Sequence, residues 1–497
     1  MFTVNPLLLN DFYKQSHANM YAPGTKQVYS TWTWRSSRLD NIDKVVAFGF
    51  QGFIKEFLID YFNANFFDKR RSVVVGEYAD TLSKTLGPQG VDENVCRAEE
   101  LWELGYLPLE IQAVPEGMLV PIRTPMMAFW NTDPKFYWLT NYIETLLSAE
   151  LWQPMTSATL AHGYKKSLVE WCRKTNGVLD AVEYQGHDFS FRGMAGWHAA
   201  AKSGAGHLLS FVGTDTIPAI SYLQKYYNAD LDSTIVGTSI PASEHSVAES
   251  YGDINEREYF RHIIEDVYPK GLVSIVSDTW DFWKVITETI PSLKNSILNR
   301  DGRLVIRPDS GDPVKIICGD PEADEECVRK GAVECLWDIF GGTESVNGFR
   351  QLDPHIGLIY GDAITWTRAN TICELLAKKK FCSTNVVFGI GSYTYQYNTR
   401  DTFGGAVKSS MAVIKGKETF MFKNPKTDNG VKKSQKGCSV VFEDGSYKDE
   451  FTLNEAINHP KNVLKTIFKD GKLISETDFI AITNRLNSYV NYIHPMD

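Results

Sequence analysis

The sequence predicts an α/β protein that consists of an irregular α/β barrel of about seven strands and a second, α+β domain built from both chain ends. Three observations predict this architecture. The chain has 497 residues, of which 43% are hydrophobic, so it can bury a large core. Short apolar runs and helical stretches alternate through its middle, which is typical of a parallel sheet. The two ends differ in character from this middle part.

The middle of the chain holds seven strand-like runs, each followed by a turn that carries Gly, Asp, Ser or Arg. These runs end within residues 187–193, 210–215, 233–246, 272–278, 303–311, 356–362 and 386–392. Between them lie amphipathic segments that we expect to be helical, among them residues 256–268, 281–298 and 363–380. So many consecutive units favour closure into a barrel, with a doubly wound open sheet as the alternative.

Segments near both chain ends predict the second domain. Residues 131–152 should form a helix, because Asp133 is a good N-cap, Pro134 suits the first helical position and apolar residues follow on one side. Residues 109–130 and 437–451 have strand-and-turn sequences. We therefore assign residues 1–155 and 393–497 to the α+β domain and residues 156–392 to the barrel.

Charge and composition limit the class of protein. The formal net charge of −10 argues against general binding to nucleic acids or membrane surfaces, because both are polyanions. An anionic substrate would need a locally positive pocket. The eight cysteines form no CxxC pair, the first residues lack the basic stretch of a signal peptide, and no apolar run approaches the roughly 20 residues of a membrane span. We expect a soluble, cytoplasmic protein with reduced thiols.

Polar residues and glycines gather where the predicted strands end. They are Asp188, Arg192, Asp215, Glu244, His245, Asp278, Arg307, Asp309, Asp362 and Gly391. A single Asp after a strand is as often a helix cap as a functional group. In a barrel, however, the carboxyl ends of all strands form one rim, where active sites lie. The convergence of all these residues on one rim therefore predicts a site.

The residue types at the rim suit a phosphorylated sugar. The turn GIG at residues 389–391 lets backbone N–H groups approach an anion closely. Arg307 supplies a guanidinium for phosphate oxygens, and Asp309 can accept from sugar hydroxyls or hold Mg²⁺.

His245 lies in PASEHSVAE, a stretch of small side chains at residues 241–249. It can be a structural histidine, a general base or a nucleophile that accepts a phosphoryl group. Both active roles need a carboxylate that orients the ring. Asp278, at the end of the next strand, is the better candidate, since the side chain of Glu244 points away from His245 in an extended loop.

Several motifs in series resemble the nicotinamide phosphoribosyltransferases, a group within the type II phosphoribosyltransferases. They are LLLNDFYKQSH, EYQGHDFSFRG, GTD, SIPASEHS, VSIVSD, IRPDSGDP, YGD, FGIGS and TRD, in this order. The resemblance implies a type II phosphoribosyltransferase barrel. It also implies transfer of phosphoribose from phosphoribosyl pyrophosphate to nicotinamide, which gives nicotinamide mononucleotide and pyrophosphate in NAD salvage.

The resemblance also implies roles at the ring. Phe189 and Tyr13 match the aromatic residues that sandwich the pyridine ring, with Tyr13, near Asp11, expected from the partner subunit of a homodimer. Arg307 is expected to contact both nicotinamide and phosphate. Asp215 matches the carboxylate that accepts the amide N–H of nicotinamide. His245 matches a histidine that is phosphorylated by ATP, with Asp278 and Glu244 beside it, and so couples ATP hydrolysis to synthesis.

Further positions match groups around the phosphates and the ribose. They are Arg192, Ser239, Ser274, Arg307, Asp309, Gly361, Asp362, Gly391, Ser392, Arg400, Lys408 and Lys423, with Mg²⁺ held mainly by substrate phosphates. Taken by itself, the basic stretch at residues 423–437 is more typical of a solvated surface. The chain departs from the family where GIGSY replaces a longer glycine run and where Ala406 offers no hydroxyl.

Three alternatives remain at this stage. The nearest is a nicotinate phosphoribosyltransferase. A metal-dependent barrel hydrolase or lyase could use the same rim carboxylates, with His187 and His245 sharing a metal, although the chain has no HxH or HExxH pair. A non-catalytic signalling role is the third, because a fold alone does not fix function.

Overall fold

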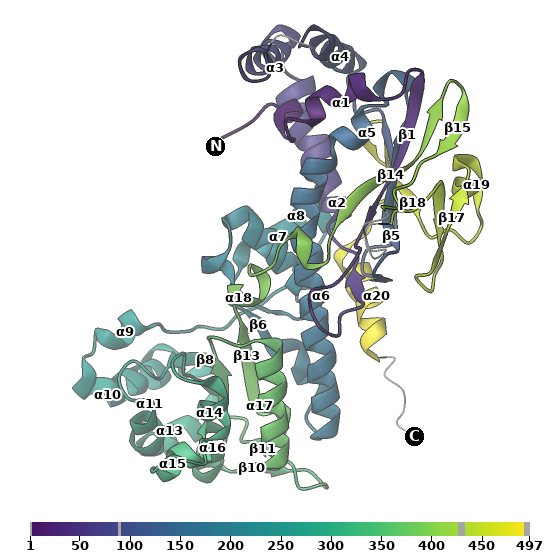
Figure 1. Cartoon of the computed structure of the whole chain (residues 1–497). Coiled ribbons are helices and arrows are strands. Elements are labelled where there is room, and N and C mark those ends of the chain that lie inside the picture. The colour runs from purple at the N-terminus through teal and green to yellow at the C-terminus, as the bar shows by residue number, and fades with distance from the viewer. Residues whose placement is uncertain (1, 88–90, 426–432, 492–497) are drawn as a thin grey trace. The chain divides into compact units, whose positions relative to one another are not determined.

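The computed structural model describes residues 2–87, 91–425 and 433–491, and the chain divides into two units (Figure 1). Unit 1 comprises residues 1–159, 222–229 and 398–489, and unit 2 comprises residues 160–221, 230–397 and 490–497. The sequence placed the boundaries after residues 155 and 392. The sequence analysis assigned residues 222–229 to the barrel, whereas in the structure they belong to unit 1. These residues are the end of a helix and the turn after it.

Unit 1 is built on a seven-stranded antiparallel sheet that both chain ends supply. Its order is β15-β14-β1-β5-β3-β18-β19. The amino-terminal strands β1 (Thr25–Thr33), β3 (Leu109–Ala113) and β5 (Pro125–Asn131) form the centre. The flanking strands are β14 (Ala406–Ile414), β15 (Lys417–Phe420), β18 (Lys465–Lys469) and β19 (Lys472–Leu473). Every residue of β3 and β5 is buried, including the polar residues Glu110, Gln112 and Asn131.

Two short antiparallel pairs and several helices complete unit 1. The pairs are β2 (Lys44–Val46) with β4 (Leu119–Pro121), and β16 (Cys438–Val441) with β17 (Tyr447–Phe451). The helices are α1 (Lys14–Met20), α2 (Phe50–Phe53), α3 (Arg71–Thr85), α4 (Val91–Leu104), α5 (Leu139–Tyr142), α19 (Leu453–Asn458) and α20 (Phe479–Asn491).

The helix predicted at residues 131–152 differs from the structure. Asp133 does cap a helical turn, since its Oδ1 accepts from the Lys135 backbone N at 2.8 Å, but that turn ends at Phe136. After α5 a new helix, α6 (Glu144–Lys174), begins and continues through Pro154 into unit 2. The apolar periodicity does not mark the break at Ile143, where the chain stays close to helical conformation. No helix among the described residues is long and apolar enough to cross a membrane.

Unit 2 contains a six-stranded parallel sheet in the order β7-β6-β13-β12-β9-β8. The strands are β6 (Gly186–Asp188), β7 (Gly213–Thr214), β8 (Lys270–Val276), β9 (Asp301–Arg307), β12 (Ile356–Tyr360) and β13 (Val386–Ile390). Six of the seven predicted runs are therefore strands, and the sheet is parallel as predicted.

The seventh run connects the two edges of this sheet. Thr238 bridges to Gly213 of β7, and Ala242 bridges to Ser274 of β8, both in parallel orientation. These are isolated bridges and not a ladder, and Pro241 between them has no N–H to donate. The curled sheet thus forms an irregular barrel whose seventh side is held by residues 238–242.

Helices follow the strands of unit 2, as its alternating sequence predicts. They are α7 (Trp197–His207), α8 (Ile217–Tyr227, whose end belongs to unit 1), α9 (His245–Glu249), α10 (Glu256–Arg261), α11 (Phe282–Lys284), α12 (Ile290–Ser292), α13 (Lys294–Leu298), α14 (Pro313–Cys318), α15 (Glu326–Lys330), α16 (Ala332–Phe340), α17 (Trp366–Lys378) and α18 (Ser392–Tyr395). A hairpin of β10 (Gly342–Glu344) and β11 (Arg350–Leu352) precedes β12. Figure 1 shows α14, α16 and α17 beside the strands.

Candidate active site

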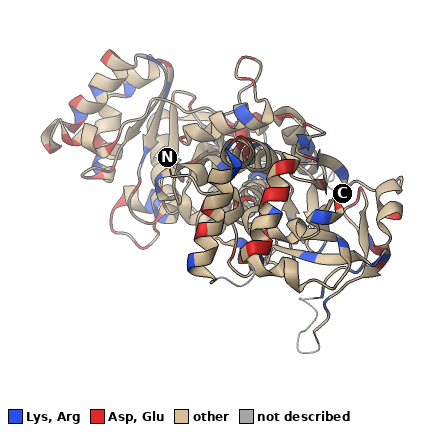
Figure 2. Cartoon of the chain, turned by 90° about the horizontal axis from the view of Figure 1, so that it is seen from above, with Lys and Arg blue, Asp and Glu red and all other residues tan. Residues whose placement is uncertain are grey.

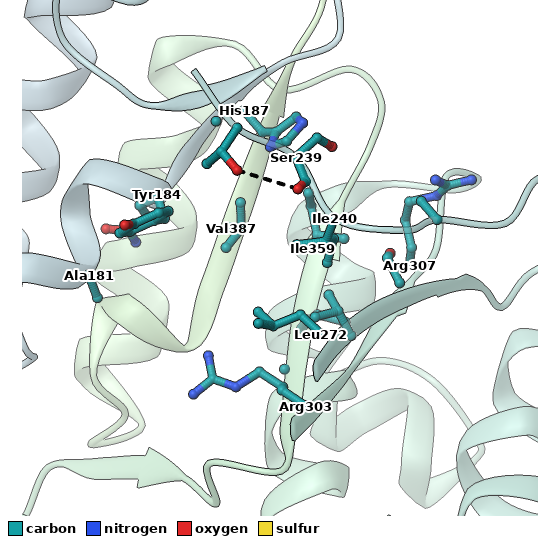
Figure 3. Close-up of a pocket in the computed structure, with 18 of the residues that line it drawn as sticks. Ala181, Tyr184, His187, Ser239, Ile240, Leu272, Arg303, Arg307, Ile359 and Val387 are labelled. Carbon is teal, nitrogen blue, oxygen red and sulfur yellow. Dashed lines mark hydrogen bonds between the residues drawn. The ribbon is translucent and has the colours of Figure 1, made fainter. Parts of the chain in front are cut away.

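A cavity of about 460 Å³ occupies the inside of the unit 2 barrel. Its wall includes residues from every strand of the sheet and from the bridging segment 238–242. In β9 the alternate residues Arg303, Val305 and Arg307 line it, because successive side chains of a strand point to opposite faces. Figure 3 shows Arg307 near the carboxyl end of this strand and Arg303 toward the other end.

The carboxyl-terminal end of the cavity gathers predicted site residues. Phe189, Asp215 and Arg307, predicted for the pyridine ring, line it. Ser239 and Ser274, predicted for the phosphates and the ribose, line it as well. The Ser274 hydroxyl is buried and has no hydrogen-bond partner among the described residues, so it is available to a ligand.

Asp215 lies at the centre of a short hydrogen-bond network. His187 Nε2 lies 2.8 Å from Asp215 Oδ1, and Ser239 Oγ donates to the same oxygen at 2.7 Å. Burial alone would raise the pKa of Asp215, but the hydrogen bonds from His187 and Ser239 and the charge of Arg307 outweigh it, so the pKa is lowered. The cavity therefore presents an ionised carboxylate near neutral pH. The sequence analysis considered His187 only as a metal ligand and missed this contact.

The position of Phe189 depends on the glycine turn. A Cβ on Gly389 would lie 2.5 Å from Phe189 Cδ2, so a larger residue there would displace the ring. Gly391 has no atom within 4 Å of its would-be Cβ. Open space at that glycine leaves room for a ligand to approach the backbone, as expected for a phosphate cradle. Ser392 begins α18 directly after it.

Arg307, Asp309 and Asp278 form a charged cluster where β8 and β9 end. Arg307 Nη2 donates to the Ser243 carbonyl at 2.7 Å, and its Nε lies 3.7 Å from Asp309 Oδ2. Asp278 Oδ2 accepts from the backbone N–H groups of Asp309 and Ser310 at 3.0 and 2.7 Å. Burial raises the pKa of Asp309, while Arg307 lowers it in part. The cluster holds its carboxylates in fixed orientations.

Two carboxylate oxygens of this cluster are buried without a hydrogen-bond partner in the described part of the chain. They are Asp278 Oδ1 and Asp309 Oδ1. A Cβ on Gly361 would lie 2.1 Å from Asp309 Oδ1, so the glycine makes room for this carboxylate. Asp362 follows, and next to it Ala363 has φ 56°, a strained conformation of the kind that gathers at functional sites. Unpaired oxygens of this sort fit ribose hydroxyls or a hard cation.

His245 is the first residue of α9, and its side chain is 44% exposed. Its nearest partner is Thr279 Oγ1, 3.1 Å from Nδ1, which the sequence analysis did not identify. Asp278 Oδ1 lies 3.9 Å from Nε2, beyond hydrogen-bond distance. Glu244 pairs with the Ser246 hydroxyl rather than with His245. The geometry therefore favours Asp278 over Glu244 beside His245 and adds Thr279.

Arg192 belongs to the turn Phe191–Gly193, which packs against the start of α18. A Cβ on Gly193 would lie 2.0 Å from Ser392 Oγ, so these two turns meet closely. Arg192 and Ser392 thus come from neighbouring segments of unit 2.

The remaining predicted site residues lie in unit 1. Asp11 Oδ2 accepts from Thr145 Oγ1 at 2.6 Å, and Tyr13 is 57% exposed, with its ring edge-on to His17. Arg400 pairs with Asp401 at 3.1 Å. Lys423 is exposed, and residues 426–432 of its basic stretch lie outside the described residues.

Lys408 lines a second cavity, of about 300 Å³, that lies within unit 1. Arg35, Arg123 and Lys433 line it as well, whereas Asp449 is the one carboxylate among its described lining residues. Burial lowers the pKa of Lys408, and the nearby charges of Arg35 and Lys423 add to this effect. Converging cations of this kind fit a polyphosphate. Ala406 is also on the wall and adds no hydrogen-bond donor.

Elsewhere the charges are mixed. Figure 2 shows Lys and Arg interspersed with Asp and Glu along the elements visible from that side. The cationic cavity of unit 1 is therefore a local feature of a chain whose formal net charge is −10. It is a locally positive pocket, of the kind that an anionic ligand would need.

The described residues limit how a metal could be held. No three His, Cys, Asp or Glu side chains within them converge on one metal position. The unpaired oxygens of Asp278 and Asp309 fit Mg²⁺ that takes its other ligands from substrate phosphates. His187 pairs with Asp215, whereas His245 contacts Thr279.

Residues 184–472 match the model of the nicotinate phosphoribosyltransferase (NAPRTase) family. The chain belongs to this family. It is 48% identical over 500 aligned residues to a protein of Acinetobacter baylyi named nicotinamide phosphoribosyltransferase, with 98% of this chain and 97% of the relative covered. A protein of Xanthomonas campestris pv. campestris with the same name is 31% identical, with 96% and 97% covered.

Two solved structures have a fold similar to that of this chain. The chain is similar to nicotinate-nucleotide pyrophosphorylase from Pyrococcus furiosus, with a TM-score of 0.56, 16% identity and coverage of 99% of this chain and 98% of the other. Human nicotinic acid phosphoribosyltransferase gives a TM-score of 0.55 at 14% identity, with 98% and 95% covered. The fold class predicted from the sequence, an α/β barrel with an α+β domain, thus agrees with the likeness to these two structures.

Proposed function

We propose that the chain transfers phosphoribose from phosphoribosyl pyrophosphate to the pyridine nitrogen of nicotinamide, giving nicotinamide mononucleotide and pyrophosphate in NAD salvage. The observation that carries this proposal is the ionised carboxylate of Asp215 beside Phe189 in the barrel cavity. An aromatic face suits a ring that becomes a pyridinium cation in the product, since such contacts contribute about 0.5 to 2 kcal/mol.

Asp215 favours the amide over the acid. Nicotinamide can donate an amide N–H to the carboxylate, whereas nicotinate would bring a second negative charge. Two like charges at about 4 Å and an effective dielectric near 20 repel by on the order of 4 kcal/mol. The names of the two relatives agree with this choice.

We assign the phosphates and the ribose to the remaining polar groups. Gly391, Ser392 and Arg192 surround the open turn after β13, where a 5′-phosphate fits. Asp309 and Asp362 would accept from ribose hydroxyls, and Arg307 would stabilise charge on the departing pyrophosphate. Mg²⁺ on the substrate phosphates would supply further positive charge to that leaving group. The cationic cavity of unit 1, together with Arg400 and Lys423, suits pyrophosphate or the polyphosphate of ATP.

We further propose that ATP hydrolysis is coupled to the transfer through His245. A ring nitrogen would attack the γ-phosphorus, so that a P–N bond forms, the P–O bond to ADP breaks, and water later releases phosphate. Exposure of His245 and the unpaired Asp278 Oδ1 support this role, because a phosphorylated histidine needs both access and a group that orients the ring.

The proposal includes a homodimer in the cytoplasm. Tyr13 is exposed at the start of α1, and we propose that it and Asp11 reach the partner subunit's barrel and cover the second face of the pyridine ring. The eight cysteines, none of which forms a disulfide, suit a reducing compartment.

The test is formation of mononucleotide from phosphoribosyl pyrophosphate and Mg²⁺, with nicotinamide or nicotinate supplied separately, each with and without ATP. The proposal predicts product from nicotinamide, raised by ATP. His245→Ala should keep some transfer and lose the stimulation by ATP. Unchanged stimulation in that variant would contradict the phosphohistidine.

A nicotinate phosphoribosyltransferase is the second candidate, because the matching family model carries that name. Product from nicotinate but not from nicotinamide in the same assay would establish it and would overturn the role given to Asp215.

A further inference from the structure

Two hydrogen bonds end on the same oxygen of Asp215. His187 and Ser239 both contact Oδ1, at 2.8 and 2.7 Å. No described protein group hydrogen-bonds Oδ2, and the side chain of Asp215 is 50% exposed. The carboxylate is therefore presented with one oxygen occupied and the other open.

Backbone pairing fixes His187 relative to Asp215. His187 of β6 pairs with Gly213 of β7, and the Asp215 backbone N–H donates to the Asp188 carbonyl at 3.0 Å. The His187 ring packs over Gly213, where an added Cβ would lie 2.7 Å from Nδ1. The His187 side chain is only 12% exposed, so its ring has little freedom to turn away.

The protonation of this pair follows from the carboxylate. An ionised Asp215 can only accept hydrogen bonds, so His187 Nε2 must carry the proton that lies between them. A neutral imidazole protonated on Nε2 is sufficient. The same ring lies beside Phe189, with centroids 4.7 Å apart and an interplanar angle of 51°, so His187 adjoins both groups assigned to the pyridine ring.

We propose that His187 is a specificity-determining positioning residue, which holds Asp215 Oδ1 so that Oδ2 faces the cavity as an acceptor for the amide N–H of nicotinamide. This inference rests on the proposed function. Nicotinate has no proton to offer to that oxygen near neutral pH. Without His187 the carboxylate would be held by Ser239 alone and could turn, which would weaken the amide contact.

The experiment measures kcat/KM for nicotinamide and for nicotinate in the wild type and in the His187→Ala, His187→Gln and Ser239→Ala variants. His187→Ala should raise the KM for nicotinamide and lower the nicotinamide-to-nicotinate ratio by roughly tenfold or more, because a hydrogen bond to a charged group is lost. The KM for phosphoribosyl pyrophosphate should change by less than about twofold. His187→Gln should restore most of the ratio, since Gln Nε2 reaches a similar position with an N–H.

A double-mutant comparison distinguishes an effect of His187 on the position of Asp215 from a general disturbance of the site. If His187 acts through Asp215, adding His187→Ala to Asp215→Ala should change the ratio no further. Ser239→Ala, which leaves the histidine in place, should show a smaller loss in the same direction and serves if His187→Ala fails to fold.

The outcomes distinguish this inference from the function on which it rests. An active wild type whose ratio is unchanged in His187→Ala and Ser239→Ala would overturn the inference and leave the function standing. The inference would also be overturned if His187→Ala lowered the nicotinamide-to-nicotinate ratio as much in the Asp215→Ala variant as in the wild type. A wild type that makes no mononucleotide from nicotinamide would overturn the function and the inference together.

Discussion

The barrel cavity of unit 2 and the cationic cavity of unit 1 differ in what forms their walls. The barrel cavity of unit 2 combines apolar side chains and glycines with a few oriented polar groups, among them Asp215 and Arg307. The cavity of unit 1 is smaller and carries four cationic side chains. An aromatic ring is recognised by shape and by one directed hydrogen bond, whereas a polyphosphate is recognised by charge. Most of the following substitutions change one of these two cavities, and one changes a buried carboxylate outside both.

The largest effect should come from Asp215→Asn. An amide in place of the carboxylate removes the repulsion of nicotinate and can donate to it. The nicotinamide-to-nicotinate ratio of kcat/KM should fall, by up to about a thousandfold if the full repulsion of on the order of 4 kcal/mol is relieved. Steady-state kinetics with both substrates would measure this change. An unchanged ratio would remove Asp215 as the cause of selectivity.

A buried carboxylate of unit 1 shows the opposite behaviour to Asp215. Glu116 Oε1 accepts from the Phe50 backbone N at 2.6 Å and from Tyr227 Oη at 3.1 Å, but burial prevails and raises its pKa to about 7. A carboxyl with a raised folded-state pKa stabilises the fold fully below its ordinary pKa and loses this contribution as the pH rises through about 7.

Glu116→Gln should therefore flatten the pH dependence of the free energy of unfolding between about pH 4.5 and 7. The contribution involved is on the order of 3 kcal/mol, from a pKa raised from 4.5 to about 7. Chemical denaturation across this range would measure it. A wild type whose free energy of unfolding rises toward pH 7, with Glu116→Gln following the same curve, would contradict the prediction.

Gly389→Ala should disturb the proposed binding site for the pyridine ring without changing any charged group. The added Cβ would meet Phe189 Cδ2 at 2.5 Å and push the ring from its position. We expect the KM for nicotinamide to rise by roughly tenfold or more, since stacking and orientation are both disturbed. Gly391→Ala is the matched variant, because its Cβ points into open space.

The matched variant should affect the other substrate. Gly391→Ala should leave the KM for nicotinamide nearly unchanged and raise the KM for phosphoribosyl pyrophosphate. If Gly389→Ala and Gly391→Ala raise the KM for nicotinamide equally, the turn tolerates no side chain at either glycine. Displacement of Phe189 would then not explain the effect of Gly389→Ala.

Lys408→Ala tests the cationic cavity of unit 1. Loss of one phosphate contact should raise the KM for phosphoribosyl pyrophosphate or ATP by roughly tenfold and reduce its dependence on salt concentration. The selectivity between nicotinamide and nicotinate should stay as in the wild type. A change in that selectivity would contradict the assignment of phosphate binding to the unit 1 cavity and of ring selectivity to the barrel cavity.

The two cavities also differ in how far the sequence could predict them. The positions of Asp215, Arg307 and Asp309 could be predicted because each lies at the end of a strand of a regular β/α repeat or just after it. Arg35, Arg123 and Lys433 lie far apart along both chain ends, and only the folding of unit 1 brings them to one cavity. No periodicity marks them. Their cavity could not be found without the fold.

The sequence also does not show which side chains touch, so some local contacts of the site could not be predicted. His187 lies within a strand-like run, so its contact with Asp215 depends on the pairing of β6 with β7. Nothing in the sequence distinguishes Thr279 from other residues that follow a strand. Its contact with His245 depends on the conformation of the turn. The seventh strand was predicted from its β-branched residues, but Pro241 cannot donate to a ladder and only isolated bridges form.

The most direct test of the central claim is a competition experiment. The wild type, phosphoribosyl pyrophosphate, Mg²⁺ and ATP are mixed with equimolar nicotinamide and nicotinate, and the two mononucleotides are separated by chromatography. We predict that nicotinamide mononucleotide is formed in at least a hundredfold excess, because Asp215 accepts from the amide and repels the acid. Equal amounts of both products, or an excess of nicotinate mononucleotide, would contradict this account of the barrel cavity.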